Sequence, residues 1–263
     1  MSEIVTIDHI IVQLEDIVAQ CITNNSRLGY FATLYLKVTR KVKDGIAAGQ
    51  FQDGRRMERL DVVFASRYLD AYYKYLKKES TTSSWSITFA QAERSSTLVL
   101  QHLLLGMNAH INLDLGIAAV EVCEGDLFAL QPDFDAINDI ISVLTNEVLY
   151  GLGQVSPLLS LLGLYASDNN SALIQFSIGN ARDGAWCFSE NLLRRDSVAR
   201  IQFIADRDKT INKLGKSLVE GTGFFMKLTF WLIHMFETKR PSKVIGILND
   251  YQKKKIVINK SGS

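Results

Sequence analysis

The sequence predicts an all-α fold, a single domain of about nine or ten helices packed around one buried helix near residues 98–120. Apolar residues recur at intervals of three and four along most of the chain, which is the helical period. Only three prolines occur in 263 residues, which suits long helices. Hydrophobic residues make up 47% and charged residues 22%, so the composition is that of a globular chain with a sizeable core. No segment indicates a convincing sheet.

The first helix is expected to begin after Thr6-Ile7-Asp8, because Ile11, Leu14, Val18 and Ile22 then share one face. Ser80–Ser84 is the clearest linker, and Ser84 is a suitable N-cap for the helix after it. The other helices are expected over residues 27–42, 56–78, 85–94, 98–120, 133–150, 172–193, 196–219, 223–238 and 244–251.

Two proline signals are used to place helix starts. Pro132-Asp133 predicts a helix that runs to about Tyr150, with Asp133 as its N-cap. Ser156-Pro157 predicts another start, an N-cap followed by proline at the first helical position. Ser167–Asn170 is expected to be a loop, and Pro241 is expected to close the helix before it.

Charge, the N-terminal residues and the cysteines indicate which binding partners and which compartment to expect. Lys and Arg total 29 and Asp and Glu total 28, so no basic excess indicates a nucleic-acid partner. The N-terminus lacks the basic region of a signal peptide, and the three cysteines form no CxxC pair, so we expect a cytoplasmic protein with reduced thiols. Residues 1–251 are expected to form the domain and residues 252–263 a disordered basic tail. The pattern does not define the oligomeric state.

Two apolar segments are tested for membrane spanning. Residues 98–120 are long enough, but polar side chains interrupt them. Residues 224–236 are too short for a span, which needs about 20 residues. We therefore expect no transmembrane segment and two buried helices, with contact between the second helix and a membrane surface as the alternative.

The central helix is unusual because it is apolar enough to be buried on nearly every side and yet carries six polar side chains. At 100° per residue these form two stripes. One stripe holds His102, His110 and Asp114, and the other holds Gln101, Asn108 and Asn112. Because an unpaired buried polar group costs roughly 1–3 kcal/mol, we expect either a hydrogen-bonded network or a hydrated cavity. Gly106 and Ala109 thin this helix and allow a close approach by another group.

The functional interpretation is that this helix lines an active-site cavity. His110 and Asp114 are four residues apart and within hydrogen-bonding reach, so Asp114 is expected to orient His110. His102 is the expected acid–base counterpart. The alternative is a satisfied polar network that fixes the register of the helix.

Further candidates come from two other helices. Asp61 and Tyr68 share a helix face that also carries Ala65, so they are expected to supply hydrogen bonds inside the cavity. In the segment SIGNARDGAWCF, Arg182 is expected to pair with a buried carboxylate such as Asp61 or Asp114, or to bind an anionic group, and Trp186 is expected to form an aromatic wall.

No cofactor is favoured. Neither a Walker loop, a GxGxxG fingerprint nor a GxSxG elbow occurs. A divalent metal is the open alternative, with His102, His110, Asp114, His234 and Glu237 as its ligands. Their spacing fits no closed site of known type, and an ion pair at the helix end between Glu237 and Lys239 or Arg240 competes with the metal interpretation.

Four segments together resemble a known family. They are RMERLDVVFASRYLDAYY, LQHLLLGMNAHINLDLG, Asp133-Phe134 with Ile137-Asn138, and ARDGAW. The chain is similar, from about Arg27 to Glu237, to a bacterial family catalogued only as a domain of unknown function. The resemblance implies a helical domain and no established activity. The family pattern comprises Asp61, Arg67, Tyr68, His102, Asn108, His110, Asn112, Asp114, Arg182, Asp183 and Trp186.

The sequence therefore predicts an enzyme that acts on a small, partly apolar molecule. His110, oriented by Asp114, is the expected general base or acid, with His102 as its counterpart. Asn108, Asn112 and Arg182 are expected to bind oxygen atoms or anionic groups of the substrate, and Asp61, Tyr68 and Trp186 to complete the binding site. The first alternative is a metal-dependent hydrolase that uses the His/Asp cluster. The second is a non-catalytic ligand-binding or scaffold protein.

Overall fold

A computed structural model describes residues 6–165, 177–220 and 223–250. Within these ranges the chain is helical and has no strand, so the all-α prediction is confirmed. The helices are α1 (Ile7–Thr23), α2 (Gly29–Ala47), α3 (Gly54–Leu76), α4 (Ser83–Ala92), α5 (Val99–Ala109), the π-helix η1 (His110–Leu115), α6 (Gly116–Val122), α7 (Leu127–Val155), the 3₁₀-helix η2 (Leu159–Tyr165), α9 (Ile178–Leu193), α10 (Ser197–Glu220), α11 (Gly223–Phe236) and α12 (Pro241–Asp250).

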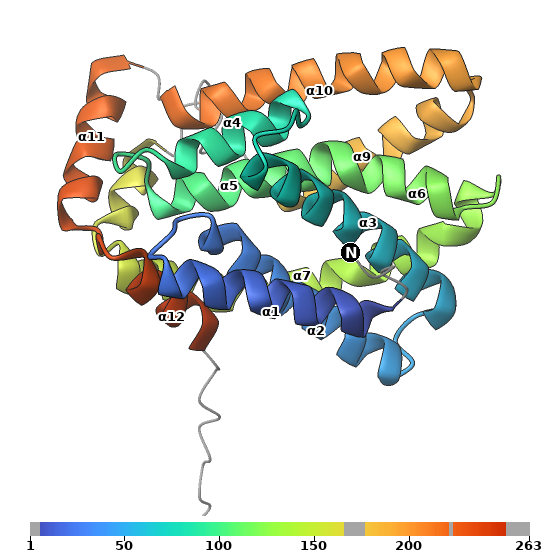
Figure 1. The fold of residues 1–263 in the computed structure, drawn as a ribbon, viewed down its shortest axis with the longest axis horizontal. Coiled ribbons are helices and arrows are strands. Elements are labelled where there is room, and N and C mark those ends of the chain that lie inside the picture. The colour runs from blue at the N-terminus through green and yellow to red at the C-terminus, as the bar shows by residue number, and fades with distance from the viewer. Residues whose placement is uncertain (1–5, 166–176, 221–222, 251–263) are drawn as a thin grey trace, which may run out of the picture.

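The central helix is α5, η1 and α6 in unbroken succession, and it runs through the middle of the bundle (Figure 1). Helices α2, α4 and α10 contact α5, whereas α3, α9 and α10 contact η1. In the described part of the chain, Val99–Val122 is the one helix that is long and apolar enough to cross a membrane, and its most apolar window is 83% buried by the rest of the structure. The predicted buried central helix is therefore confirmed.

Side-chain caps explain where several helices begin. The side chains of Thr6, Asp53, Asp126 and Ser177 each accept a hydrogen bond from a backbone N–H in the first turn of α1, α3, α7 and α9, respectively. These bonds satisfy donors that have no partner within the helix.

The predicted start of α7 is wrong. Asp126 caps this helix, so Pro132 lies in the second turn and Asp133 is not an N-cap. Asp133 is instead buried against the start of α3, where it accepts hydrogen bonds from the Gln52 and Asp53 amides and from Arg56. The helix tolerates the missing proline N–H because only one hydrogen bond near its start is lost.

Three smaller expectations also differ from the structure. Ser84 lies within α4, whose N-cap residue is Thr82. Ser156 is the C-cap of α7, and its hydroxyl donates to Glu237 instead of capping a new α-helix; only the 3₁₀-helix η2 follows, from Leu159. Pro241 begins α12. The predicted loop at 167–170, the first part of the predicted helix at 172–193 and the tail at 252–263 lie outside the described residues.

Candidate functional site: a His–Asp pair beside an apolar cavity

The central helix changes its winding at the predicted site. Residues His110–Leu115 form a π-helical turn between two α-helical segments. Such turns are rare, and they occur frequently at functional sites because the wider turn redirects side chains. This turn contains His110, Asn112 and Asp114.

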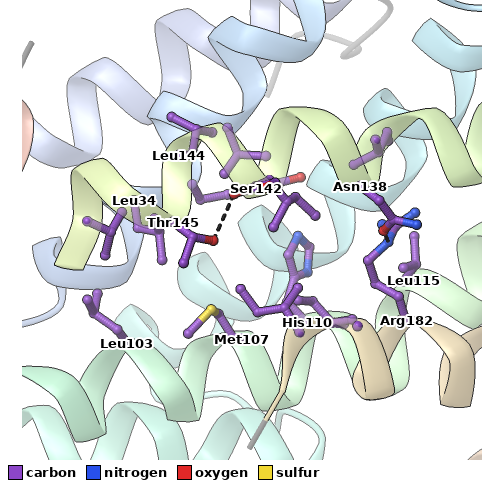
Figure 2. Close-up of a pocket in the computed structure, with 18 of the residues that line it drawn as sticks. Leu34, Leu103, Met107, His110, Leu115, Asn138, Ser142, Leu144, Thr145 and Arg182 are labelled. Carbon is purple, nitrogen blue, oxygen red and sulfur yellow. Dashed lines mark hydrogen bonds between the residues drawn. The ribbon is translucent and has the colours of Figure 1, made fainter. Parts of the chain in front are cut away.

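A cavity of about 660 Å³ lies against this turn, between the central helix and residues of α2, α3, α7 and the start of α9. Its volume falls in the range of sites for drug-sized ligands. Figure 2 shows Leu34, Leu103 and Leu144 toward one end and Asn138, Leu115 and Arg182 toward the other, with Met107 and His110 between them. Most lining residues are aliphatic, and the polar ones are Tyr35, Asp61, His110, Asn138, Ser142, Thr145, Ser177 and Arg182.

His110 and Asp114 form the expected pair. His110 Nδ1 lies 3.3 Å from Asp114 Oδ2, and both side chains are buried. The carboxylate has two further donors: Trp85 Nε1–H at 2.8 Å from Oδ2 and Arg67 Nε–H at 3.0 Å from Oδ1. These donors fix the position of the carboxylate.

The geometry assigns the tautomer of His110. Because Nδ1 faces a carboxylate, the proton lies on Nδ1 and Nε2 keeps its lone pair. Burial lowers the pKa of His110, an effect that the hydrogen bond with Asp114 opposes. Phe64 stacks on the imidazole with ring centroids 3.6 Å apart. His110 Nε2 is buried and has no hydrogen-bond partner.

Two other residues that line the cavity also have a buried polar atom without a well-formed hydrogen bond, the Tyr35 hydroxyl, whose neighbour is the Thr39 hydroxyl, and Asp61 Oδ2. Burial, with a smaller effect of the nearby Glu58 charge, raises the pKa of Asp61 to about 7. Burial also raises the pKa of Tyr35, and the charges of Asp61 and Asp114 add to this effect. The Tyr35 ring lies edge-on to the His110 ring, with centroids 4.5 Å apart. Three residues that line the cavity therefore each have a buried polar atom that makes no hydrogen bond.

Arg182 lines the cavity. The sequence predicted that it pairs with a buried carboxylate such as Asp61 or Asp114, and the structure does not have this pairing. Its Nε–H donates to Asn138 Oδ1 at 2.7 Å, and its Nη2 donates to the Phe134 carbonyl. Burial lowers the pKa of Arg182 to about 10. Trp186 packs on Phe134, with ring centroids 5.0 Å apart, and is not among the lining residues. The side-chain oxygen of Asn138 and the backbone carbonyl of Phe134, both in α7, thus accept the hydrogen bonds of Arg182 in place of the expected carboxylate.

His102 is not brought together with His110 in the cavity. It packs edge-on against Tyr30 and lines a second, very small pocket together with Tyr68. Burial, followed by the charge of Arg27, lowers the pKa of His102 to about 3. His102 and Tyr68 therefore belong to the aromatic core beside α4. Neither residue lines the cavity beside His110.

The amide stripe faces α10 rather than the cavity. Asn108 Nδ2 donates to the Ile211 carbonyl at 2.9 Å, and Asn112 Nδ2 donates to Asn108 Oδ1 at 3.1 Å. Gln101 Nε2 donates to the carbonyls of Leu218 and Val219. The amide stripe is thus present, but it joins two helices instead of lining the cavity.

Of the five residues of the alternative metal site, His110 and Asp114 lie together, but the others do not join them in one cluster. Glu237 is buried at the start of α5, where it accepts from the Val99 amide at 3.1 Å and from Ser156. Lys239 donates to the backbone carbonyl of His234 rather than pairing with Glu237. Within the described ranges, no group of three or more His, Cys, Asp or Glu side chains is placed to hold a metal ion.

Sequence reasoning missed Tyr35 and Phe64. Both are aromatic residues at ordinary core spacing, so no local pattern distinguishes them. Arg67 was noted only through the family resemblance, and its half-buried side chain proves to be a donor to Asp114.

These features define a class: an all-helical protein with an apolar cavity and one buried His–Asp pair in a π-helical turn. Residues 7–221 match a family of unknown function, DUF5995, and the chain belongs to that family. The matched range starts 20 residues before the resemblance found in the sequence, which runs from about residue 27 to 237, and ends 16 residues before that resemblance does. Comparisons with curated proteins and with solved structures give no match.

Proposed function

We propose that the protein is an acid–base enzyme for a small, largely apolar, neutral molecule that carries a carbonyl or hydroxyl oxygen. The observation that carries this proposal is the set of buried, unpartnered polar atoms on Tyr35, Asp61 and His110, three residues that line one cavity. Each such atom costs free energy in the ligand-free protein, and a ligand oxygen that displaces the side chains covering these atoms would supply the missing hydrogen bonds.

The apolar lining supports a mainly hydrocarbon ligand, since burial of apolar surface is the main source of its affinity. A neutral polar group fits better than an anion, because Asp61 is buried, its Oδ2 has no donor and the Glu58 charge is near, so negative charge is disfavoured beside it. Arg182 is the one cationic side chain among the described lining residues, and it already donates to Asn138 and Phe134.

The chemistry that these groups fit is removal of a proton from a carbon next to a carbonyl group. His110 Nε2 takes the proton, the C–H electrons form a carbon–carbon double bond, and the carbonyl electrons move to oxygen. Tyr35 and protonated Asp61 donate hydrogen bonds to that oxygen as it gains charge. Asp114 stabilises the imidazolium, and return of the proton from His110 to carbon restores the enzyme.

A series of matched probes tests the binding part of the proposal. The probes are an alkylphenol, the alkylbenzene of the same chain length and the corresponding alkylbenzoate. Calorimetry measures the affinity of the protein for each probe. We expect the phenol to bind tightest, because it exchanges hydrogen bonds with Tyr35, Asp61 and His110. Tyr35→Phe should remove most of its advantage over the hydrocarbon, and Tyr73→Phe, outside the cavity, should not. Tightest binding of the benzoate would contradict the assignment of a neutral ligand.

Hydrogen–deuterium exchange tests the catalytic part. A long-chain methyl ketone is incubated with the protein in D₂O, and exchange at the carbons next to the carbonyl is followed by NMR. We expect faster exchange with the protein than without it, and loss of this acceleration in His110→Gln. If the probes bind but exchange is not accelerated, the protein is a binding protein and not the proposed enzyme.

A further inference from the structure

Helix α11 presents an apolar outer face to solvent. Its sequence is GFFMKLTFWLIHMF, and it lies across one end of the bundle, roughly perpendicular to α5 and α10 (Figure 1). Phe224 is 74% exposed, Phe225 72%, Phe236 63% and Trp231 55%. An exposed apolar patch of this kind marks a surface that contacts a protein or a membrane.

The exposed residues follow the helical period. Those that share one side are Phe224, Leu228, Trp231 and Met235, at i, i+4, i+7 and i+11. The opposite side holds the buried Met226 and Ile233, which pack on Leu104 and Leu162. The helix is therefore anchored to the bundle by one face and has a second apolar face that no described residue covers.

Charge around this face indicates which partner fits. In the described residues from 213 to 243, the exposed cations are Lys213, Lys216, Lys227, Lys239, Arg240 and Lys243, and the one exposed anion is Glu220. The other acidic side chain of this stretch, Glu237, is buried. A helix with aromatic residues on one face and basic residues around it is typical of segments that lie in the surface of an anionic bilayer.

We infer that α11 docks the protein on the surface of an anionic lipid bilayer, with its aromatic face among the headgroups. The helix contains 14 residues, too short to span, so it lies in the plane of the surface. Basic residues at its flanks meet the lipid phosphates and carboxylates, while Phe224 and Trp231 enter the boundary between headgroups and acyl chains.

Docking at this end places the cavity close to lipid. Leu104 of α5 lines the cavity and also packs in the cluster that contains Met226 and Ile233 of α11. The cavity lining and the core beneath α11 therefore share Leu104. The segment matched by the family ends at residue 221, before α11, so the docking helix lies outside the matched residues.

Sedimentation of the full chain with vesicles tests this inference. One set of vesicles contains phosphatidylcholine alone and the other also contains phosphatidylserine. We expect at least about tenfold tighter binding to the anionic vesicles, weakened by salt. A blue shift of fluorescence that is lost in Trp231→Phe should accompany binding.

Variants identify the surface. Phe224→Ser with Trp231→Ser should reduce binding to anionic vesicles at least about tenfold, and Lys227→Glu with Arg240→Glu should do the same. The matched controls are Val198→Ser with Ile201→Ser, which are equally exposed apolar residues of α10, and Lys41→Glu with Lys77→Glu. Circular dichroism confirms that each variant remains helical.

Three outcomes would overturn the inference. They are no vesicle binding by the unmodified protein, binding that survives the α11 substitutions, and a stable dimer in solution that dissociates on Trp231→Ser. The last result would assign this face to a second copy of the chain. Because these readouts use neither ligand nor activity, they are independent of the proposed function.

Discussion

Arg67 and Asp114, 47 residues apart in the sequence, are joined by a charged hydrogen bond of 3.0 Å between Nε and Oδ1. This bond holds one oxygen of the carboxylate, so the other faces Trp85 and His110. The orientation of His110 therefore depends on α3 and α4 as well as on its own helix. Asp114 is a positioning residue, because it acts through His110 rather than on a ligand.

The first prediction concerns this carboxylate. Asp114→Asn should lower the free energy of unfolding by about 2–4 kcal/mol, because it leaves the Arg67 charge without its buried partner. Glu121→Gln is the matched control, since Glu121 is an exposed and more distant partner of Arg67, at 3.5 Å. This variant should change the free energy of unfolding by less than about 0.5 kcal/mol. Urea unfolding measures both. Equal losses in the two variants would show that Asp114 holds nothing more than a surface ion pair.

The helices were predictable from sequence because their signals are local. The apolar period of α1, with Ile11, Leu14 and Val18 buried as predicted, depends on neighbours within a few residues, although Ile22 at its end is exposed. The start of α7 was not predictable, because Asp126 and Pro132 both carry start signals and the choice depends on the contact of Asp133 with α3.

The candidate site was predictable in part. The pairing of His110 with Asp114 follows from their spacing, and the structure has it. The cavity has no such local signal, because residues such as Leu34 and Met107 look like any core residue in sequence. His102 packs against Tyr30 and His110 against Phe31, and only the folded chain makes these contacts between α2 and the central helix.

The second prediction concerns close packing at Gly106. A Cβ atom there would overlap the Phe31 ring, so Gly106→Ala should destabilise the protein by about 1–3 kcal/mol despite the better helix propensity of alanine. Gly153→Ala in α7 is the control, because a Cβ atom there meets nothing within 4 Å. It should stabilise the protein by about 0.5–1 kcal/mol. Thermal unfolding that gives both changes the same sign would contradict the packing of Phe31 on the central helix.

The third prediction concerns Asp133, which is fully buried and accepts from two backbone amides and Arg56. Asp133→Ala should cost about 3–5 kcal/mol, because it leaves these donors without a partner. The exposed Asp139, on the same helix, is the control, and Asp139→Ala should stay within about 0.5 kcal/mol. If Asp133 acted only as a helix cap, the loss would be nearer about 1 kcal/mol.

The last prediction concerns the dependence of stability on pH at Asp61. Its pKa rises from an ordinary value of 3.8 to about 7 in the folded protein, chiefly through burial. Between these two values the folded state holds a proton that the unfolded state has released, so the free energy of unfolding falls as pH rises across this window. Asp61→Asn removes that loss. The variant should match the unmodified protein near pH 4 and be more stable by up to about 4 kcal/mol near pH 8.

The contribution of His110 to the pH dependence has the opposite sign. Burial lowers its pKa below 6.5, so its contribution to stability is lost as pH falls below that value. It is present in both proteins and cancels from the difference between them. Urea unfolding at a series of pH values measures this difference. A difference that stays constant from pH 4 to pH 8 would show that Asp61 ionises as freely as an exposed carboxyl, and the cavity would then lose the proton donor that the proposed chemistry requires.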